Sequence, residues 1–140
     1  MLSVLVDTTI WSLGLRRRPR DLNPNELRLV DEWRRLVEDG RVTLIGPIRQ
    51  EILSGIRQER DFERVRERLA DFDDVPILRV DYEQAAQFFN SCRAKGVTGG
   101  GVDLLICSVG QRLGLPIFTT DPDFKSYSRH LPVTVHEPQP

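Results

Sequence analysis

A short strand that runs straight into a helix is indicated by the stretch Ser3-Val4-Leu5-Val6-Asp7-Thr8-Thr9-Ile10-Trp11. Four of the five residues 2–6 are apolar, and the segment is β-rich, which is typical of a buried strand in a parallel sheet. Residues 8–15 repeat their apolar side chains at helical spacing. Asp7 is therefore expected at the carboxyl end of a strand, which is where open parallel sheets place their ligands.

Strand and helix alternate along the rest of the chain, with no repeat, low-complexity stretch or linker that would divide it. Further strands are expected over residues 42–45, 75–80 and 116–119, with an edge strand over 132–135. Further helices are expected over residues 24–38, 48–57, 62–72, 102–113 and 122–127, and another should begin with Asp81 as its N-cap. This alternation predicts one α/β domain over residues 1–140, with a central parallel β-sheet flanked by helices on both faces. Residues 135–140 are expected to form a flexible tail.

Four acidic residues carry the functional signal: Asp7, Glu51, Asp103 and Asp121. Right-handed crossovers would bring the strand ends that carry Asp7 and Asp121 to one edge of the sheet. Asp103 opens an almost wholly apolar helix, where an acid needs a partner or a metal. Clustered carboxylates repel one another, and hard cations such as Mg²⁺ or Mn²⁺ prefer oxygen ligands. The pattern predicts a metal-dependent enzyme that acts on phosphates, although each acid taken alone could be a helix cap or a surface residue.

Charge is balanced over the whole chain, with 20 basic and 21 acidic residues, so net charge does not indicate nucleic acid. The basic run Arg16-Arg17-Arg18-Pro19-Arg20 is an exception to this even mixture. It is either a solvated loop or an edge that attracts phosphates. On the second interpretation, Arg16, Arg17 and Arg18 would contact the substrate.

Composition favours a cytoplasmic protein with no membrane partner, because no apolar run approaches the roughly 20 residues of a membrane span and no leader sequence is evident. Cys92 and Cys107 are expected to be buried free thiols. Surface or turn positions are expected for His130 and His136, which lie near the C-terminus and away from the acidic positions.

Four blocks of sequence occur in an order that is typical of one known family. They are Val6-Asp7-Thr8-Thr9-Ile10-Trp11, Glu51 after Pro47, Asp103-Leu104-Leu105-Ile106 and Thr119-Thr120-Asp121-Pro122-Asp123-Phe124. Together they resemble the PIN domain, and in particular toxins of the VapC type. The resemblance extends over essentially the whole chain.

The resemblance implies an endoribonuclease that depends on Mg²⁺ or Mn²⁺. Its four acids correspond to Asp7, Glu51, Asp103 and Asp121, as catalytic residues and metal ligands. Three further positions would support them: Thr9, the hydroxyl two residues after the first acid; Thr119, the threonine of the T-x-D block; and Asp123, a frequent additional acid that ranks behind the others.

The resemblance also implies the toxin component of a type II toxin–antitoxin system. Such a toxin cleaves tRNA or rRNA to 5′-phosphate and 3′-hydroxyl ends, and so inhibits translation. Its partner is a small VapB-like antitoxin that often inserts an arginine among the acids, and homodimers or hetero-oligomers with the antitoxin are common. We hypothesise that one or two cations bind the scissile phosphate and lower the pKa of a water that attacks in line.

Several alternatives remain open at this point. The chain could be a PIN-domain nuclease for RNA processing or DNA outside any toxin–antitoxin pair, or a PIN-fold interaction protein with weak catalysis. A receiver domain is disfavoured because Lys125 lies in a short helix and threonines follow Asp7. A haloacid-dehalogenase-like phosphatase is disfavoured because Thr9 stands where a second aspartate is needed.

Overall fold

Strand β1 (Val4–Val6) is the centre of the sheet in the computed structural model, which describes residues 2–139. It pairs in parallel with β2 (Val42–Thr43) on one side and with β3 (Ile117–Phe118) on the other, so the strand order is β2-β1-β3. All three residues of β1 are fully buried. This burial is expected for a parallel strand that is covered on both faces.

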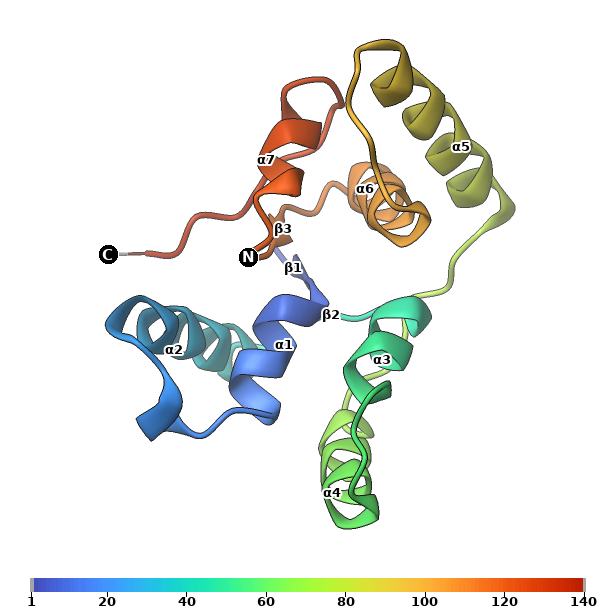
Figure 1. Cartoon of the computed structure of the whole chain (residues 1–140). Coiled ribbons are helices and arrows are strands. Elements are labelled where there is room, and N and C mark those ends of the chain that lie inside the picture. The colour runs from blue at the N-terminus through green and yellow to red at the C-terminus, as the bar shows by residue number, and fades with distance from the viewer. Residues whose placement is uncertain (1, 140) are drawn as a thin grey trace.

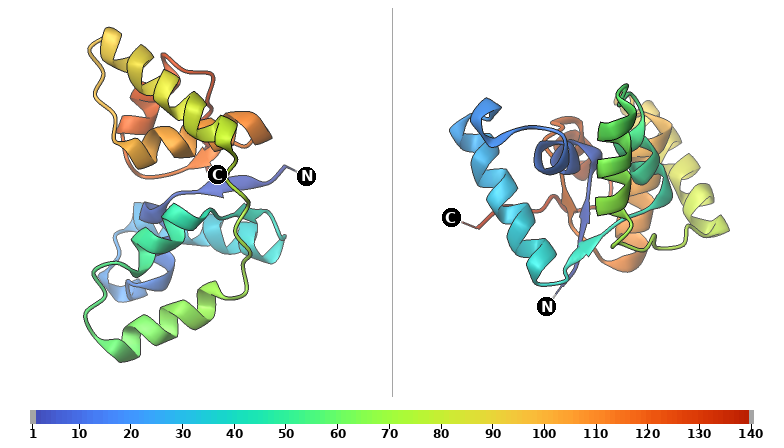
Figure 2. Two further views of the ribbon diagram at one scale, coloured as in Figure 1. Left: turned by 90° about the vertical axis from the view of Figure 1, so that its right-hand side faces the viewer. Right: turned by 90° about the horizontal axis from the view of Figure 1, so that it is seen from below.

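Helices cover both faces of this sheet, as the sequence predicts (Figures 1 and 2). They are α1 (Thr8–Leu15), α2 (Pro24–Glu38), α3 (Gly46–Leu53), α4 (Glu59–Leu69), α5 (Arg79–Ala94), α6 (Gly101–Leu113) and α7 (Asp123–Ser128), with a short 3₁₀ helix at Pro19–Asp21. Helices α1 to α4 lie on one side of β1 and α5 to α7 on the other (Figure 2, left). The prediction of an α/β domain with a central parallel sheet is confirmed.

Local sequence signals explain where several helices begin and end. Helix α2 begins with a capping box: Asn23 Oδ1 accepts the N–H of Glu26 at 2.8 Å, and Glu26 Oε1 accepts the N–H of Asn23 at 3.0 Å. Pro24 occupies the first helical position, where its missing N–H costs nothing. Helix α6 ends at Gly114, whose φ of 67° is a left-handed conformation that glycine adopts without strain.

Two predicted strands are absent from the described residues. The first, over residues 75–80, is replaced by an isolated bridge just before it, between Asp74 and Leu44, and residues 79 and 80 already belong to α5. Asp81 is not the N-cap of this helix but its third residue, where its carboxylate accepts the N–H of Leu78 at 2.8 Å. Over residues 132–135 the structure has a single bridge, from Val135 to Ile117. Of the expected tail, Pro140 lies outside the described residues.

Aromatic side chains fill the core beneath α1 and α2. Trp11 packs edge-to-face against Trp33, with ring centroids 5.6 Å apart, and against Phe72, with centroids 5.1 Å apart. Cys92 and Cys107 are buried free thiols, as predicted. No helix within residues 2–139 is both long enough and apolar enough to cross a membrane.

Candidate active site

The acidic residues come from five different elements that meet at one edge of the sheet. Asp7 follows β1, and Asp121 follows β3 after two threonines. Because β1 and β3 are adjacent parallel strands, their carboxyl ends lie side by side. Asp103 is in the first turn of α6, Asp123 begins α7 and Glu51 lies near the end of α3.

Three carboxylates form the tightest group. Asp103, Asp121 and Asp123 each place one oxygen so that the three oxygens lie within 4.8 Å of one another. The N–H of Asp123 donates to Asp121 Oδ1 at 2.9 Å, which ties the start of α7 to the loop after β3. The sequence ranks Asp123 behind the other acids, whereas the structure places it in this group and leaves Asp7 outside it.

Asp7 is buried beside this group and is held by two hydroxyls. Thr9 Oγ1 donates to Asp7 Oδ2 at 3.0 Å, and Thr119 Oγ1 donates to the same oxygen at 2.8 Å. Thr119 Oγ1 also accepts the N–H of Asp121 at 3.0 Å, and Thr9 Oγ1 accepts the N–H of Thr120 at 3.0 Å. These bonds fix the loop that carries Asp121 relative to the end of β1.

Tyr127 is a site residue that the sequence does not reveal. Its hydroxyl donates to Asp103 Oδ2 at 2.9 Å from α7. Burial raises the pKa of Asp103, the Tyr127 hydrogen bond lowers it, and the charges of the other aspartates raise it again, so the net shift is upward. Burial and the neighbouring Asp103 also raise the pKa of Tyr127, which keeps its hydroxyl protonated as a donor. In the sequence, an aromatic residue on a short helix is indistinguishable from a core residue.

Glu51 faces the acids from α3. Glu51 is an exposed residue, but partial burial of its carboxylate raises its pKa. The charges of Asp7 and Asp103 raise this pKa further, and a hydrogen bond from Thr8 lowers it by less. Asp7, Glu51 and Asp103 are therefore close enough to repel one another.

This arrangement fits a hard divalent cation. The donor atoms are carboxylate and hydroxyl oxygens, which Mg²⁺ and Mn²⁺ prefer. The raised pKa values of Glu51 and Asp103 reflect burial and repulsion between the carboxylates, both of which a bound cation would offset. The Thr8 hydroxyl, which is buried beside Glu51, provides one more oxygen at the rim of the site. The nearby Cys107 does not suit a soft metal, because burial raises the pKa of its thiol.

The three candidate arginines lie at different places. Arg16 and Arg17 line a hollow that also contains Thr8 and Thr9. Arg18 does not line this hollow, and its guanidinium lies 3.4 Å from a carboxylate oxygen of Asp21. The structure therefore brings two of the three arginines near the acidic site.

Known proteins provide an independent comparison. The structure is similar to FitAcB from Neisseria gonorrhoeae, with a TM-score of 0.74 and 22% identity over 96% of this chain and 97% of that chain. It is similar to VapBC2 from Rickettsia felis, solved with a DNA fragment from their promoter, with a TM-score of 0.73 and 14% identity over 96% and 98% of the two chains. It is also similar to VapBC-5 of the VapBC family of toxin-antitoxin systems from Mycobacterium tuberculosis, with a TM-score of 0.66 and 17% identity over 96% and 98%.

At these identities the three structures establish a shared fold and nothing more. Comparison with curated protein sequences finds no match. The sequence itself matches the PIN domain over residues 4–130, which is nearly the whole chain and includes every acid of the site. The chain belongs to the PIN domain family.

Proposed function

We propose that this protein is a Mg²⁺- or Mn²⁺-dependent endoribonuclease and the toxin of a type II toxin–antitoxin pair. It would cleave tRNA or rRNA to 5′-phosphate and 3′-hydroxyl ends and thereby inhibit translation. The observation that carries the proposal is the convergence of Asp103, Asp121 and Asp123, whose oxygens lie within 4.8 Å of one another. Membership of the PIN family supports a nuclease rather than another metal-dependent activity.

Each acid would have a distinct task. Asp103, Asp121 and Asp123 would hold the cation, and Asp7 would contribute Oδ1, since both of its side-chain hydrogen bonds converge on Oδ2. A bound Mg²⁺ would supply Lewis-acid chemistry, by lowering the pKa of a coordinated water and offsetting the charge of the phosphate. Glu51 would orient the attacking water by accepting a hydrogen bond from it.

The supporting residues would keep this geometry fixed before substrate arrives. Thr9 and Thr119 hold Asp7, and Thr119 also holds the backbone of Asp121. Tyr127 restrains Asp103 through its hydroxyl. Such restraint matters because a displacement of about 1 Å at a catalytic group can reduce the rate by roughly 100-fold.

Two kinds of partner are part of the proposal. The similarity to chains from VapBC structures supports a small antitoxin, whose arginine could substitute for the cation among the acids. Exposed apolar residues on α5 support self-association: Tyr82 is 56% exposed, and Phe89 is 37% exposed two helical turns later. Light scattering of the protein alone and with its antitoxin would give the composition of each assembly.

The activity is tested by incubating the purified protein with total tRNA and rRNA in Mg²⁺, in Mn²⁺ or in EDTA, followed by mapping of the fragment ends. We expect cleavage with either metal, none with EDTA, and fragments with 5′-phosphate ends. Asp121→Asn should lose cleavage. Asp39→Asn should retain it, because Asp39 is an exposed acid at the end of α2.

Other results would support the alternatives. Absence of cleavage by pure, folded protein with both metals would reject the nuclease and favour a PIN-fold interaction protein. Cleavage without any effect on translation, together with no short antitoxin-like reading frame beside the gene, would favour an RNA-processing nuclease. Activity that survives in Asp121→Asn would reject the assignment of the site.

A further inference from the structure

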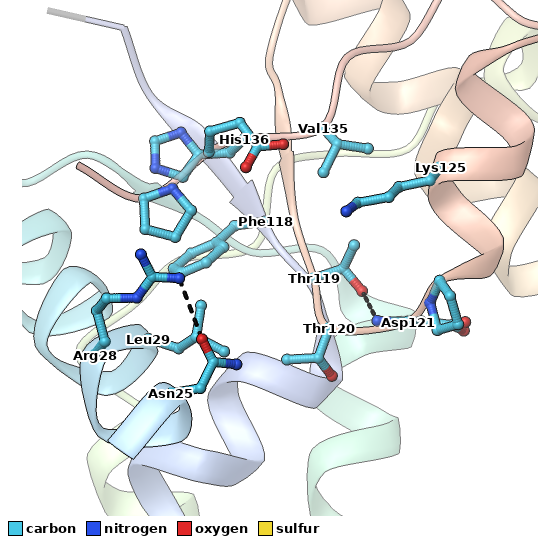
Figure 3. A pocket seen from close by; sticks show the side chains of 13 residues that line it. Asn25, Arg28, Leu29, Phe118, Thr119, Thr120, Asp121, Lys125, Val135 and His136 are labelled. Atoms are coloured by element: carbon cyan, nitrogen blue, oxygen red, sulfur yellow. Dashed lines mark hydrogen bonds between the residues drawn. The ribbon is translucent and has the colours of Figure 1, made fainter. Parts of the chain in front are cut away.

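Two hollows adjoin the acidic site. The first, here called the Lys125 pocket, has a volume of about 330 Å³ and contains Thr119 and Asp121 (Figure 3). The second, here called the Arg16 pocket, has a volume of about 680 Å³ and contains Thr8 and Thr9. Both are lined by Asn25, Leu29 and Thr120. They are therefore neighbouring parts of one groove that passes the rim of the acidic site.

Cationic side chains stand at both ends of this groove. Arg28 from α2 and Lys125 from α7 extend toward the Lys125 pocket from opposite sides (Figure 3). Neither forms an ion pair with a carboxylate of residues 2–139, and the Arg28 guanidinium instead donates to Asn25 Oδ1 at 3.1 Å. Arg16 and Arg17 line the Arg16 pocket at the other end. Each hollow thus carries two cationic side chains, alongside the acids Asp121 and Glu137 in the Lys125 pocket and Glu26 in the Arg16 pocket.

One wall of the Lys125 pocket is held in place by contacts with the rest of the fold. His136 donates its N–H to the carbonyl of Ile117 at 2.8 Å. The sequence predicts a surface or turn position for His136, but its side chain is only 13% exposed and its Nε2 lies 2.7 Å from Glu32 Oε2. Its ring also packs against Phe118, with centroids 5.1 Å apart. A wall that is already ordered reduces the entropy lost when a ligand binds.

We propose that this groove binds single-stranded RNA across the cleavage site, with Arg28 and Lys125 contacting phosphates on one side of the scissile bond and Arg16 and Arg17 on the other. The proposal rests on the proposed nuclease function. A phosphodiester chain carries a negative charge on each side of the bond that is cut, which matches a groove with a pair of cationic side chains in each of its two hollows. The hollows suit unstacked bases, which a duplex does not present.

The test measures binding separately from cleavage. In an Asp103→Asn background, which leaves the RNA intact, a fluorescein-labelled single-stranded oligonucleotide and its duplex are titrated by anisotropy at several KCl concentrations. The logarithm of the binding constant falls with the logarithm of the salt concentration, and each phosphate contact to a single strand adds about 0.7 to the steepness of that fall (the slope). Arg28→Ala with Lys125→Ala should therefore make the fall less steep by about 1.4. Arg16→Ala with Arg17→Ala should have a similar effect.

The matched control removes the same charges elsewhere. Arg34→Ala with Lys95→Ala deletes one exposed arginine of α2 and one exposed lysine after α5, and should leave the slope unchanged. The proposal that the groove binds single-stranded RNA would be overturned by an unchanged slope in the Arg28 and Lys125 variant, or by equal binding of duplex and single strand. The proposal would also be overturned if that variant lost binding of the antitoxin while binding RNA normally.

The two proposals fail in different ways. If the wild-type protein cleaves RNA but the slopes of both groove variants equal that of the control, the nuclease stands and the groove is wrong. If the wild-type protein binds single strands with the expected slopes but cleaves nothing in Mg²⁺ or Mn²⁺, the nuclease is wrong and the groove stands as a binding site. Circular dichroism and thermal melting of each variant would establish that the fold is retained.

Discussion

Thr119 Oγ1 donates a hydrogen bond to Asp7 Oδ2 at 2.8 Å, although the two residues are 112 positions apart in the sequence. The same hydroxyl oxygen accepts the N–H of Asp121 at 3.0 Å. One threonine therefore positions both the acid at the end of β1 and the loop that follows β3. Since these two strands meet only in the folded sheet, this part of the site can form only together with the fold.

Removal of the Thr119 hydroxyl should weaken both stability and cleavage. Thr119→Val keeps the branched shape but takes one of two hydroxyl donors from Asp7, which is only 6% exposed. We expect a loss of about 1–3 kcal/mol in the free energy of unfolding, measured with urea. The kcat/KM for RNA cleavage should fall roughly 100-fold because Asp121 loses its restraint. Thr119→Ser should restore both quantities, and Thr134→Val, at an exposed position, should change neither.

Neutralising one acid should stabilise the protein in the absence of metal. Asp103→Asn keeps an oxygen that can accept from Tyr127 and removes one negative charge. A carboxyl whose pKa is raised in the folded state opposes folding once it ionises, so the variant should melt higher in EDTA at neutral pH. A gain of about 1 kcal/mol corresponds to roughly 2–4 °C in a domain of this size.

The same variant should respond less to metal. Saturating Mg²⁺ should raise the melting temperature of the wild-type protein, because a ligand that binds only the folded state stabilises it. Asp103→Asn should gain less, while Asp39→Asn should behave as the wild-type protein does in both media. A variant that melts lower than the wild-type protein in EDTA would contradict the idea that these carboxylates repel one another.

The Asp81–Arg112 pair should make stability depend on pH. Burial raises the pKa of Asp81, but hydrogen bonds from Arg112 at 2.7 and 2.9 Å and from the N–H of Leu78 outweigh it, so the net shift is downward from 3.8. A lowered pKa contributes stability above the unfolded-state value, and this contribution is lost as the pH falls through the folded-state value. Asp81→Asn should therefore be less stable than the wild-type protein at pH 7, by about 1–3 kcal/mol.

The difference should shrink as the pH falls below about 4, where the carboxyl of the unfolded wild-type chain is already protonated. Urea unfolding at pH 7, 5 and 3 would measure it, with Asp73→Asn as an exposed control. A difference that is constant over this range would show that Asp81 does not act through its charge.

The sequence predicts the fold well where a short stretch of residues favours one type of secondary structure over the others. The short, β-rich apolar run before Asp7 favours a buried strand, which the structure has, and the Asn23-Pro24 pair begins α2 as expected. Asp81 shows where the local signal is ambiguous. An acid at the N-cap and an acid three residues later both stabilise a helix start, and in the structure Asp81 takes the second of these positions because α5 begins at Arg79. The early start of α5 also means that the end of the strand expected over residues 75–80 is helical instead.

The site is less predictable because it depends on how α7 is placed. Asp7, Thr9, Thr119 and Asp121 flank strands, so sheet topology alone brings them together. Asp123 and Tyr127 reach Asp103 only because α7 folds back over the start of α6. No pattern of spacing in a six-residue helix specifies that orientation.

Packing between α1 and α2 should tolerate no side chain at Gly14. A Cβ added at this position would lie 2.6 Å from the ring of Trp33, which is itself packed against Trp11. Gly14→Ala should therefore destabilise the fold by about 1–3 kcal/mol, as overpacked cores do. Gly101→Ala is the matched control, because a Cβ there meets nothing within 4 Å, and it should be neutral or slightly stabilising.

A second substitution separates crowding from helix propensity. Alanine favours a helix more than glycine does, so Gly14→Ala alone sets propensity against the clash. If the clash dominates, replacing Trp33 with Leu in the Gly14→Ala background should cost less than the same replacement in the wild-type protein, because the smaller side chain leaves room for the new methyl group. Urea unfolding of the four proteins measures this coupling. Additive losses would mean that α1 shifts to accommodate the methyl group, and that Gly14 is not what sets the distance between the two helices.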